Sequence, residues 1–182
     1  MIERFFSLQT KRVVPENLLD EVLSMSGRTV PRPEAIEKLK THSALGEIIA
    51  AGMTAMQLNP LCAEEEFSAQ VQAAGRRVAA KLERNLSALG SIASIAPLLG
   101  LFGTVVGMIE IFGAQIPGAG NPAELAHGIS VALYNTAFGL VIAIPSLVVW
   151  RHLRAKVDNH VVELEIDGER LVRHFFPKSA GQ

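Results

Sequence analysis

The chain of 182 residues lacks several features that soluble enzymes and secreted domains commonly carry. Its single cysteine, Cys62, excludes an intrachain disulfide and a cysteine-rich metal site, and predicts a small buried thiol in a reducing compartment. Aromatic residues make up only 5% of the chain, and the net charge of −1 gives no basic surface for nucleic acid. No secretory signal is expected, because no apolar run of suitable length follows Met1–Arg4.

Catalytic motifs are missing as well. The sequence contains no nucleophile–base set, no HExxH pair, no P-loop and no dinucleotide fingerprint. It therefore predicts neither an enzyme nor a bound metal or cofactor.

Charge is nearly absent from one continuous stretch. Of 17 basic and 18 acidic side chains, only Glu110 and Glu124 lie within residues 85–150. Inside that stretch, Leu86–Ile109 and Gly128–Trp150 carry no formal charge. At 1.5 Å rise per residue each reaches about 35 Å, more than the roughly 30 Å of a bilayer's hydrocarbon core. The alternative is two buried helices of a large soluble core. Neither segment has the polar stripe of a soluble surface helix, and we expect two transmembrane helices.

Basic residues predict the orientation of these spans. The connecting segment Glu110–His127 has no lysine or arginine, whereas both outer flanks do: Arg76, Arg77, Lys81 and Arg84 before the first span, and Arg151, Arg154 and Lys156 after the second. By the positive-inside rule both flanks are cytoplasmic and the connection is periplasmic. The predicted organisation is a cytoplasmic helical region 1–84, a transmembrane helix 85–112, a periplasmic loop 113–126, a transmembrane helix 127–150 and a cytoplasmic extension 151–182.

The regions outside the spans are predicted to be helical. Short helices are expected from Pro15 to Gly27, from Pro31–Pro33 onward and over Ser43–Leu58. One long helix is expected to run from about Glu64 into the first span, because no proline or turn cluster interrupts it before Pro97.

The second span is expected to continue to about Phe176, since its apolar residues keep a spacing of three and four. The predicted fold class is an all-α membrane protein. It has two long transmembrane helices that extend into the cytoplasm, together with short cytoplasmic helices.

Small residues recur at helix-neighbour spacing in both spans. The positions predicted to pack helices together are Gly100, Gly103, Gly107, Ala132 and Gly139, and Gly103 with Gly107 forms a GxxxG. Small faces allow backbones to approach closely where lipid is as apolar as leucine. Two matched faces predict a helical bundle, and two spans per chain favour oligomerisation.

Prolines and threonines within the spans are the other candidate residues. Pro97 and Pro145 predict kinks, with the alternative that they expose carbonyls along a path. The serine and threonine hydroxyls of the spans are each expected to bond back to the carbonyl one turn earlier. Thr104 and Thr136 stand apart because each lies among small residues deep in its span, where it can line a polar seam or contact another helix.

A titratable group is absent from both spans. A proton carrier in a membrane needs a group that can be neutral in lipid and briefly charged. Glu110 and His127 are the nearest candidates, but both lie at the outer edges of the spans. The chain alone does not supply the acid.

The spans resemble those of the MotA/TolQ/ExbB proton channel family, and most closely its TolQ/ExbB branch. The resemblance rests on Ala96–Gly107 (APLLGLFGTVVG) and on residues within Gly128–Pro145. Leu82–Leu86 is similar to the family's lead-in to its second transmembrane helix, and Glu3–Pro15 to the stretch that follows its first. The match covers most of the chain and is most specific in the spans.

This resemblance implies a proton-channel subunit of an energy-transducing complex in the bacterial inner membrane, with cytoplasmic N- and C-terminal regions. A pentamer of such subunits would surround a single-span ExbD- or TolR-like partner that carries a membrane aspartate. Proton flow would drive transport or work at the outer membrane, and a TonB- or TolA-like protein is a further candidate partner. Thr104 and Thr136 match the family's pore-facing threonines, which would face the partner's aspartate.

The sequence departs from this branch in two ways. The branch carries a transmembrane helix before the equivalent of Glu3, which suggests a shortened chain or a misassigned start codon. Many members have a glutamate where this chain has Val131, so the titrating acid is expected to be the partner's alone. A non-conducting membrane scaffold is the alternative function. A flagellar stator subunit is disfavoured, because that branch has four spans and a larger cytoplasmic domain.

Overall fold

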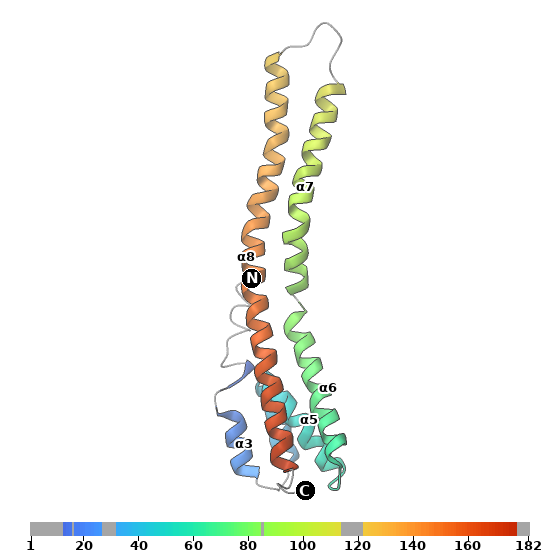
Figure 1. Ribbon diagram of the computed structural model, residues 1–182, viewed down its shortest axis with the longest axis vertical. Helices are drawn as coiled ribbons and strands as arrows, with labels where there is room; N and C mark the ends of the chain where they lie inside the picture. Colours follow the sequence, from blue (N-terminus) through green and yellow to red (C-terminus); the bar gives the residue numbers. More distant parts are fainter. Residues whose placement is uncertain (1–12, 16, 27–31, 85, 114–121, 178–182) are drawn as a thin grey trace, which may run out of the picture. The chain divides into compact units, whose positions relative to one another are not determined.

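The computed structural model describes residues 13–15, 17–26, 32–84, 86–113 and 122–177 (Figure 1). All the regular secondary structure of these ranges is α-helical. The helices are α3 (Leu18–Ser26), α4 (Pro33–His42), α5 (Ala44–Leu58), α6 (Glu64–Glu83), α7 (Leu86–Gly113) and α8 (Pro122–Phe175). The chain forms two compact units. We call Asn85–Arg154 the hairpin unit, and Met1–Arg84 together with Ala155–Gln182 the terminal unit.

Local signals account for most helix ends. Pro33 opens α4 at a position where its missing N–H is not needed. The Ser43 hydroxyl oxygen accepts a hydrogen bond from the Gly46 N–H at 3.0 Å and caps α5. Glutamates at Glu64–Glu66 occupy the first turn of α6, where the helix dipole favours negative charge. The predicted short helices are therefore confirmed in α3, α4 and α5.

The expected long helix from Glu64 into the first span is described as two helices, α6 and α7, on either side of residues 84–85. The backbone of Arg84 has right-handed helical dihedrals, and Asn85 lies outside the described residues. Continuity of the helix through Asn85 therefore stays a prediction.

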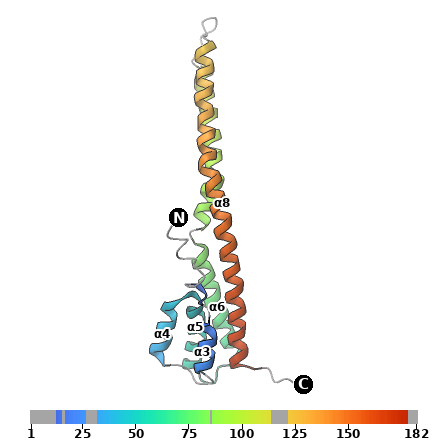
Figure 2. The ribbon, with the colours of Figure 1, turned by 90° about the vertical axis from the view of Figure 1, so that its left-hand side faces the viewer.

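The terminal unit has an aliphatic core around one aromatic ring. Figure 2 shows α3, α4 and α5 packed beside α6 and the last part of α8. Phe67 of α6 is fully buried, and its ring centroid lies 5.7 Å from that of Phe175 and 5.5 Å from that of Phe176. The other fully buried large side chains of this unit are Leu45, Ile48, Ile49, Met53, Val78, Val157 and Leu171. The end of α8 is thus held to α5 and α6 by burial of apolar surface.

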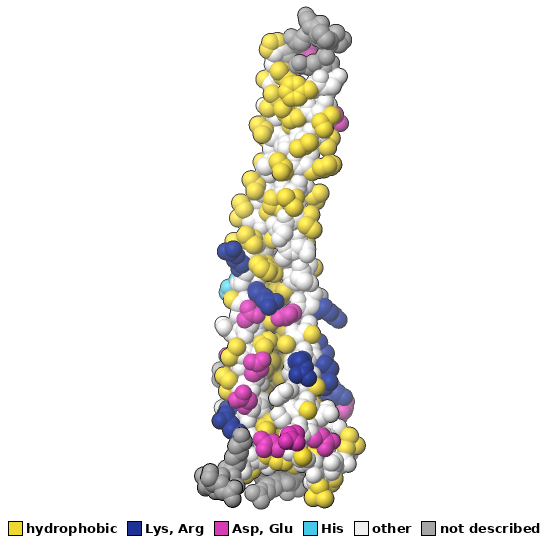
Figure 3. Space-filling model, turned by 45° about the vertical axis from the view of Figure 1, so that its right-hand side comes forward, with side chains coloured by type: hydrophobic (Ala, Val, Ile, Leu, Met, Phe, Trp, Pro, Cys, Tyr) yellow, Lys and Arg dark blue, Asp and Glu magenta, His cyan; other side chains and the backbone are white. Residues whose placement is uncertain are grey.

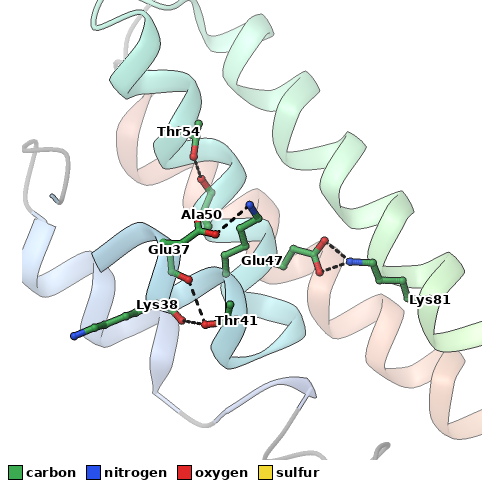
Figure 4. A network of polar contacts seen from close by, with 8 residues as sticks. Glu37, Lys38, Thr41, Glu47, Ala50, Thr54 and Lys81 are labelled. Carbon is green, nitrogen blue, oxygen red and sulfur yellow. Dashed lines mark hydrogen bonds and ion pairs between the residues drawn. The ribbon is translucent and has the colours of Figure 1, made fainter. Parts of the chain in front are cut away.

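Ion pairs at the surface connect helices that are distant in sequence. Lys81 of α6 donates to both carboxylate oxygens of Glu47 of α5, at 2.6 and 2.8 Å (Figure 4). Arg170 of α8 donates to Asp20 of α3 at 2.8 Å and to Asp167 at 3.3 Å. Burial raises the pKa of Asp167 above its usual value, and the hydrogen bond from Arg170 offsets part of that rise.

The one cysteine matches its prediction. Cys62 is buried and free. Burial raises the pKa of its thiol, and the nearby Glu66 carboxylate adds to the rise. Both effects keep the thiol protonated and unreactive.

The hairpin unit has an apolar outer surface. Leu98, Phe102, Val141 and Ile144 are each more than half exposed, and on the face shown in Figure 3 hydrophobic side chains cover α7 and the first part of α8. Only 11% and 22% of the most apolar windows of the two long helical segments are buried inside the chain. Both helices are long and apolar enough to cross a membrane. Such exposure disfavours the alternative of two helices buried in a soluble core.

The core of the terminal unit gives a first testable prediction. Phe67→Ala removes a fully buried ring and its contacts with Phe175 and Phe176, so we expect it to destabilise the folded chain by about 3–5 kcal/mol. The measurement is urea unfolding in detergent, monitored by limited proteolysis of the terminal unit. Leu61→Ala is the matched control, because Leu61 is 93% exposed and its truncation is expected to change stability little. Equal stability of the two variants would contradict the assignment of Phe67 to the core.

Candidate functional site

Close backbone contact between α7 and α8 organises the hairpin unit. A Cβ added at Gly100 would lie 2.8 Å from the carbonyl oxygen of Asn135 and 3.0 Å from Cα of Thr136. One added at Gly139 would lie 2.7 Å from the carbonyl oxygen of Ala96. The distances of 2.8 and 2.7 Å to carbonyl oxygens are too short for a real Cβ. Glycine is therefore required on both helices at this level.

The contact continues along both helices as a seam of small residues. A Cβ at Gly107 would meet that of Ala132 at 3.0 Å. Toward one end of the hairpin, the Gly128 position lies against Ile111, and toward the other, Gly90 lies against the indole of Trp150. These pairings run in opposite directions along the two helices, so α7 and α8 are antiparallel (Figure 1).

The structure places the residues expected to pack helices together along this seam. Gly100, Gly107, Ala132 and Gly139 lie within it, and Gly103 lies at one side, where its added Cβ would be 2.9 Å from Cβ of Asn135. Pro97 and Pro145 lie inside α7 and α8, but neither is among these contacts.

Thr104 and Thr136 lie on a common edge of the hairpin. Thr104 directly follows Gly103, and Thr136 directly follows Asn135, which contacts Gly103. Successive residues of an α-helix are rotated by about 100° around the helix axis. Because the helices are antiparallel, this rotation carries both threonines to the same side, away from Asn135. Both are half-buried. We call the Thr104–Thr136 side the threonine edge and the Gly103–Asn135 side the asparagine edge.

The two threonine hydroxyls differ in their bonding. Thr104 Oγ1 donates to the carbonyl oxygen of Leu101 at 2.6 Å. Ser91, Ser94, Ser130 and Ser146 donate to a carbonyl four residues earlier, so the predicted back-bonding is confirmed for these serines and for Thr104. Among the described residues, Thr136 has no hydrogen-bond partner for its hydroxyl. That hydroxyl can therefore donate to, or accept from, a group outside this hairpin.

The asparagine edge carries a groove that the sequence reasoning did not single out. It has a volume of about 450 Å³ and is lined by both helices, with Val106 and Glu110 on α7 and Val131 and Asn135 on α8. Val131 is half exposed. A signal for this edge existed in the sequence, because Val131 and Asn135 are four residues apart and so share a helix face.

No acid lies deep within the described part of the hairpin. Glu110 is exposed near the end of α7, and His127 is exposed near the start of α8. The contact of Ile111 with the Gly128 position puts both at the same end. The described residues also contain no cluster of His, Cys, Asp and Glu that could hold a metal ion. What the hairpin offers chemically is a pair of hydroxyls on one edge and an amide, with Glu110 nearer the helix end, on the other.

Residues 40–166 match the family model described as the MotA/TolQ/ExbB proton channel family. The chain is 32% identical over 173 residues to the biopolymer transport protein exbB1 of Vibrio cholerae, covering 91% of this chain and 73% of that protein. It is 32% identical over 142 residues to the putative biopolymer transport protein ExbB-like 1 of Synechocystis sp., covering 76% of this chain. The chain spans about half (54%) of the length of that second relative.

The seam gives a second prediction. Gly139→Val places a branched side chain where a Cβ alone reaches 2.7 Å from the Ala96 carbonyl oxygen. We expect it to separate the helices and to destabilise the hairpin by at least about 1–3 kcal/mol. The effect is measured by thermal unfolding in detergent, monitored by the fluorescence of the single tryptophan, Trp150. The matched control is Gly113→Val, because a Cβ at Gly113 meets nothing within 4 Å. Equal melting of the two variants would show that the seam does not hold the hairpin.

Proposed function

Since the chain belongs to the MotA/TolQ/ExbB proton channel family, we propose that it is a proton-channel subunit of an energy-transducing complex in the bacterial inner membrane. In this proposal it assembles as a homo-oligomer, a pentamer by family resemblance. The assembly surrounds an ExbD- or TolR-like single-span protein. The proton motive force then drives transport or work at the outer membrane, through a TonB- or TolA-like protein where one is present.

The observation that carries this proposal is the threonine edge. Thr104 and Thr136 lie on the same side of the hairpin, and the Thr136 hydroxyl has no partner among the described residues. A polar group without a hydrogen bond is unfavourable in lipid. A membrane carboxyl group on a partner helix would supply the missing hydrogen bond.

The same geometry supports different roles for the two proteins in proton transfer. The partner's carboxyl group takes up and releases the proton, because the described hairpin has no acid at depth. A hydroxyl can donate to the ionised carboxylate and accept from the protonated acid. Thr136, and secondarily Thr104, would therefore lower the free energy of the charged state, which lipid makes strongly unfavourable.

The valine at position 131, where many members of the branch have a glutamate, is consistent with these roles. Val131 lies on the asparagine edge, opposite the threonines, in the groove that Glu110 also lines near the end of α7. We propose that this subunit lines the proton path and that the titrating carboxyl group belongs entirely to the partner. The terminal unit, with its flanking arginines and lysines, is then cytoplasmic, and the α7–α8 connection is periplasmic.

The threonine assignment is tested by substitution. Thr136→Val keeps the shape of the side chain and removes the hydroxyl. A hydrogen bond to a charged group contributes about 1.5–3 kcal/mol, so we expect proton-driven work to fall roughly tenfold or more. Thr104→Val is expected to have a smaller effect, since Thr104 already donates to Leu101. Complementation of a strain lacking its own subunit, with the partner co-expressed, gives the measurement.

Two controls separate conduction from assembly. Thr136→Ser keeps the hydroxyl and is expected to retain most activity, and co-purification with the partner is expected to be unchanged in every variant. If both valine variants support full activity, the threonines do not serve the proton path. A scaffold that does not conduct would give that result.

The proposed orientation is tested by thiol labelling in a Cys62→Ser background. Gly113→Cys, at the end of α7, is expected to react with a membrane-impermeant maleimide added to spheroplasts, whose outer membrane has been removed. Ala155→Cys, which is exposed on α8, is expected to react only after the inner membrane has been permeabilised. Labelling of Ala155→Cys in sealed spheroplasts would overturn the orientation.

A further inference from the structure

The groove on the asparagine edge carries two polar side chains, those of Glu110 and Asn135, between apolar walls. It has a volume of about 450 Å³, and its apolar lining includes Phe102, Val106, Ile111 and Val131. Both polar side chains are exposed, and neither has a hydrogen-bond partner among the residues that the structure describes. A carboxylate or an amide against lipid is unfavourable unless another polar group covers it. The groove therefore needs a polar occupant at two points.

Glu110 and Asn135 lie at different depths along the same groove. Asn135 faces the Gly103 position of α7, and Glu110 is seven residues further along α7, or about 10 Å at 1.5 Å per residue. Side chains of an α-helix lean toward its N-terminus. Because α7 and α8 are antiparallel, these two side chains lean toward each other. The groove thus presents an acid near the end of the hairpin and an amide deeper in it.

No cation lines this groove in the described part of the hairpin. Glu110–His127 contains no lysine or arginine, and His127, which is exposed at the same end, does not line the groove. A second hairpin in the same orientation would bring no lysine or arginine to Glu110 either. An anionic headgroup would be repelled by the Glu110 carboxylate. The group that complements this acid is a cation with N–H donors that comes from outside the chain.

We propose that the groove binds the polar part of an aminophospholipid, such as phosphatidylethanolamine, from the leaflet at the Glu110 end. The primary ammonium group of the lipid donates hydrogen bonds to the Glu110 carboxylate. An ester carbonyl, separated from the ammonium by the phosphate and the glycerol, accepts a hydrogen bond from the Asn135 amide. The acyl chains continue past Phe102 along the apolar outer surface of the hairpin. This inference goes beyond the proposed function and rests only on the membrane location of the hairpin.

Native mass spectrometry of the full chain tests the headgroup contact. The purified chain is given equal amounts of phosphatidylethanolamine, phosphatidylcholine and phosphatidylglycerol with the same acyl chains. We expect phosphatidylethanolamine to be retained at least about fivefold more than phosphatidylglycerol. Phosphatidylcholine is expected to be intermediate, because its quaternary ammonium has no N–H to donate.

Variants of the acid identify the residue that reads the headgroup. Glu110→Gln is expected to remove most of the preference for phosphatidylethanolamine, and Glu110→Asp to keep it. Glu124→Gln is the matched control, because Glu124 is exposed near the same end of the hairpin but does not line the groove. That variant is expected to retain the three lipids as the unmodified chain does.

A variant of the amide separates the two contacts. Asn135→Leu removes the hydrogen bond to an ester group that all three lipids share. We therefore expect the retention of each lipid to fall about threefold while their order stays the same. A change of order in this variant, with retention unchanged, would contradict the assignment of Asn135 to the ester group.

Three results would overturn the proposal. They are equal retention of the three lipids, no retained phosphatidylethanolamine, and an unchanged preference in Glu110→Gln. High-yield cross-linking of Val131→Cys, in a Cys62→Ser background, to another polypeptide in membranes would also overturn it, because a protein would then fill the groove. Lipid retention is measured without the partner or proton-driven work, so failure of the threonine assignment would leave this test unaffected.

Discussion

Close backbone contact between α7 and α8 is the constraint on which the rest of the hairpin unit depends. Lipid is as apolar as a leucine side chain, so burial of apolar surface does not drive these helices together. Packing between small residues does so instead, and it requires glycine where Gly100 faces Thr136 and Gly139 faces Ala96. Larger apolar side chains are displaced to the outside, where they are exposed.

That constraint also determines where polar groups can lie. A seam closed by glycine and alanine has no room for hydroxyls at its centre, and Thr104 and Thr136 therefore lie on its edge. Asn135 lies on the opposite edge against Gly103. The two edges of one hairpin thus differ in chemistry, with two hydroxyls on one edge and an amide, with Glu110 nearer the helix end, on the other.

Much of the fold could be predicted from local sequence signals. The charge-free runs and the start and stop residues of α4 and α5 depend on nearby residues, and the structure agrees with them. The ion pairs of Lys81 with Glu47 and of Arg170 with Asp20 could not be predicted, since they join residues far apart in the chain.

The sequence by itself determined the all-α class, the two apolar segments and the absence of an acid between Leu86 and Ile109, because these are properties of composition and local period. It also marked Thr104 and Thr136 as polar residues among small ones. Only the tertiary structure decided that they share an edge, since this depends on the register and antiparallel direction of two helices. The groove on the asparagine edge likewise appears only when residues of α7 and α8 are packed together, and helix periodicity carries no information on such pairing.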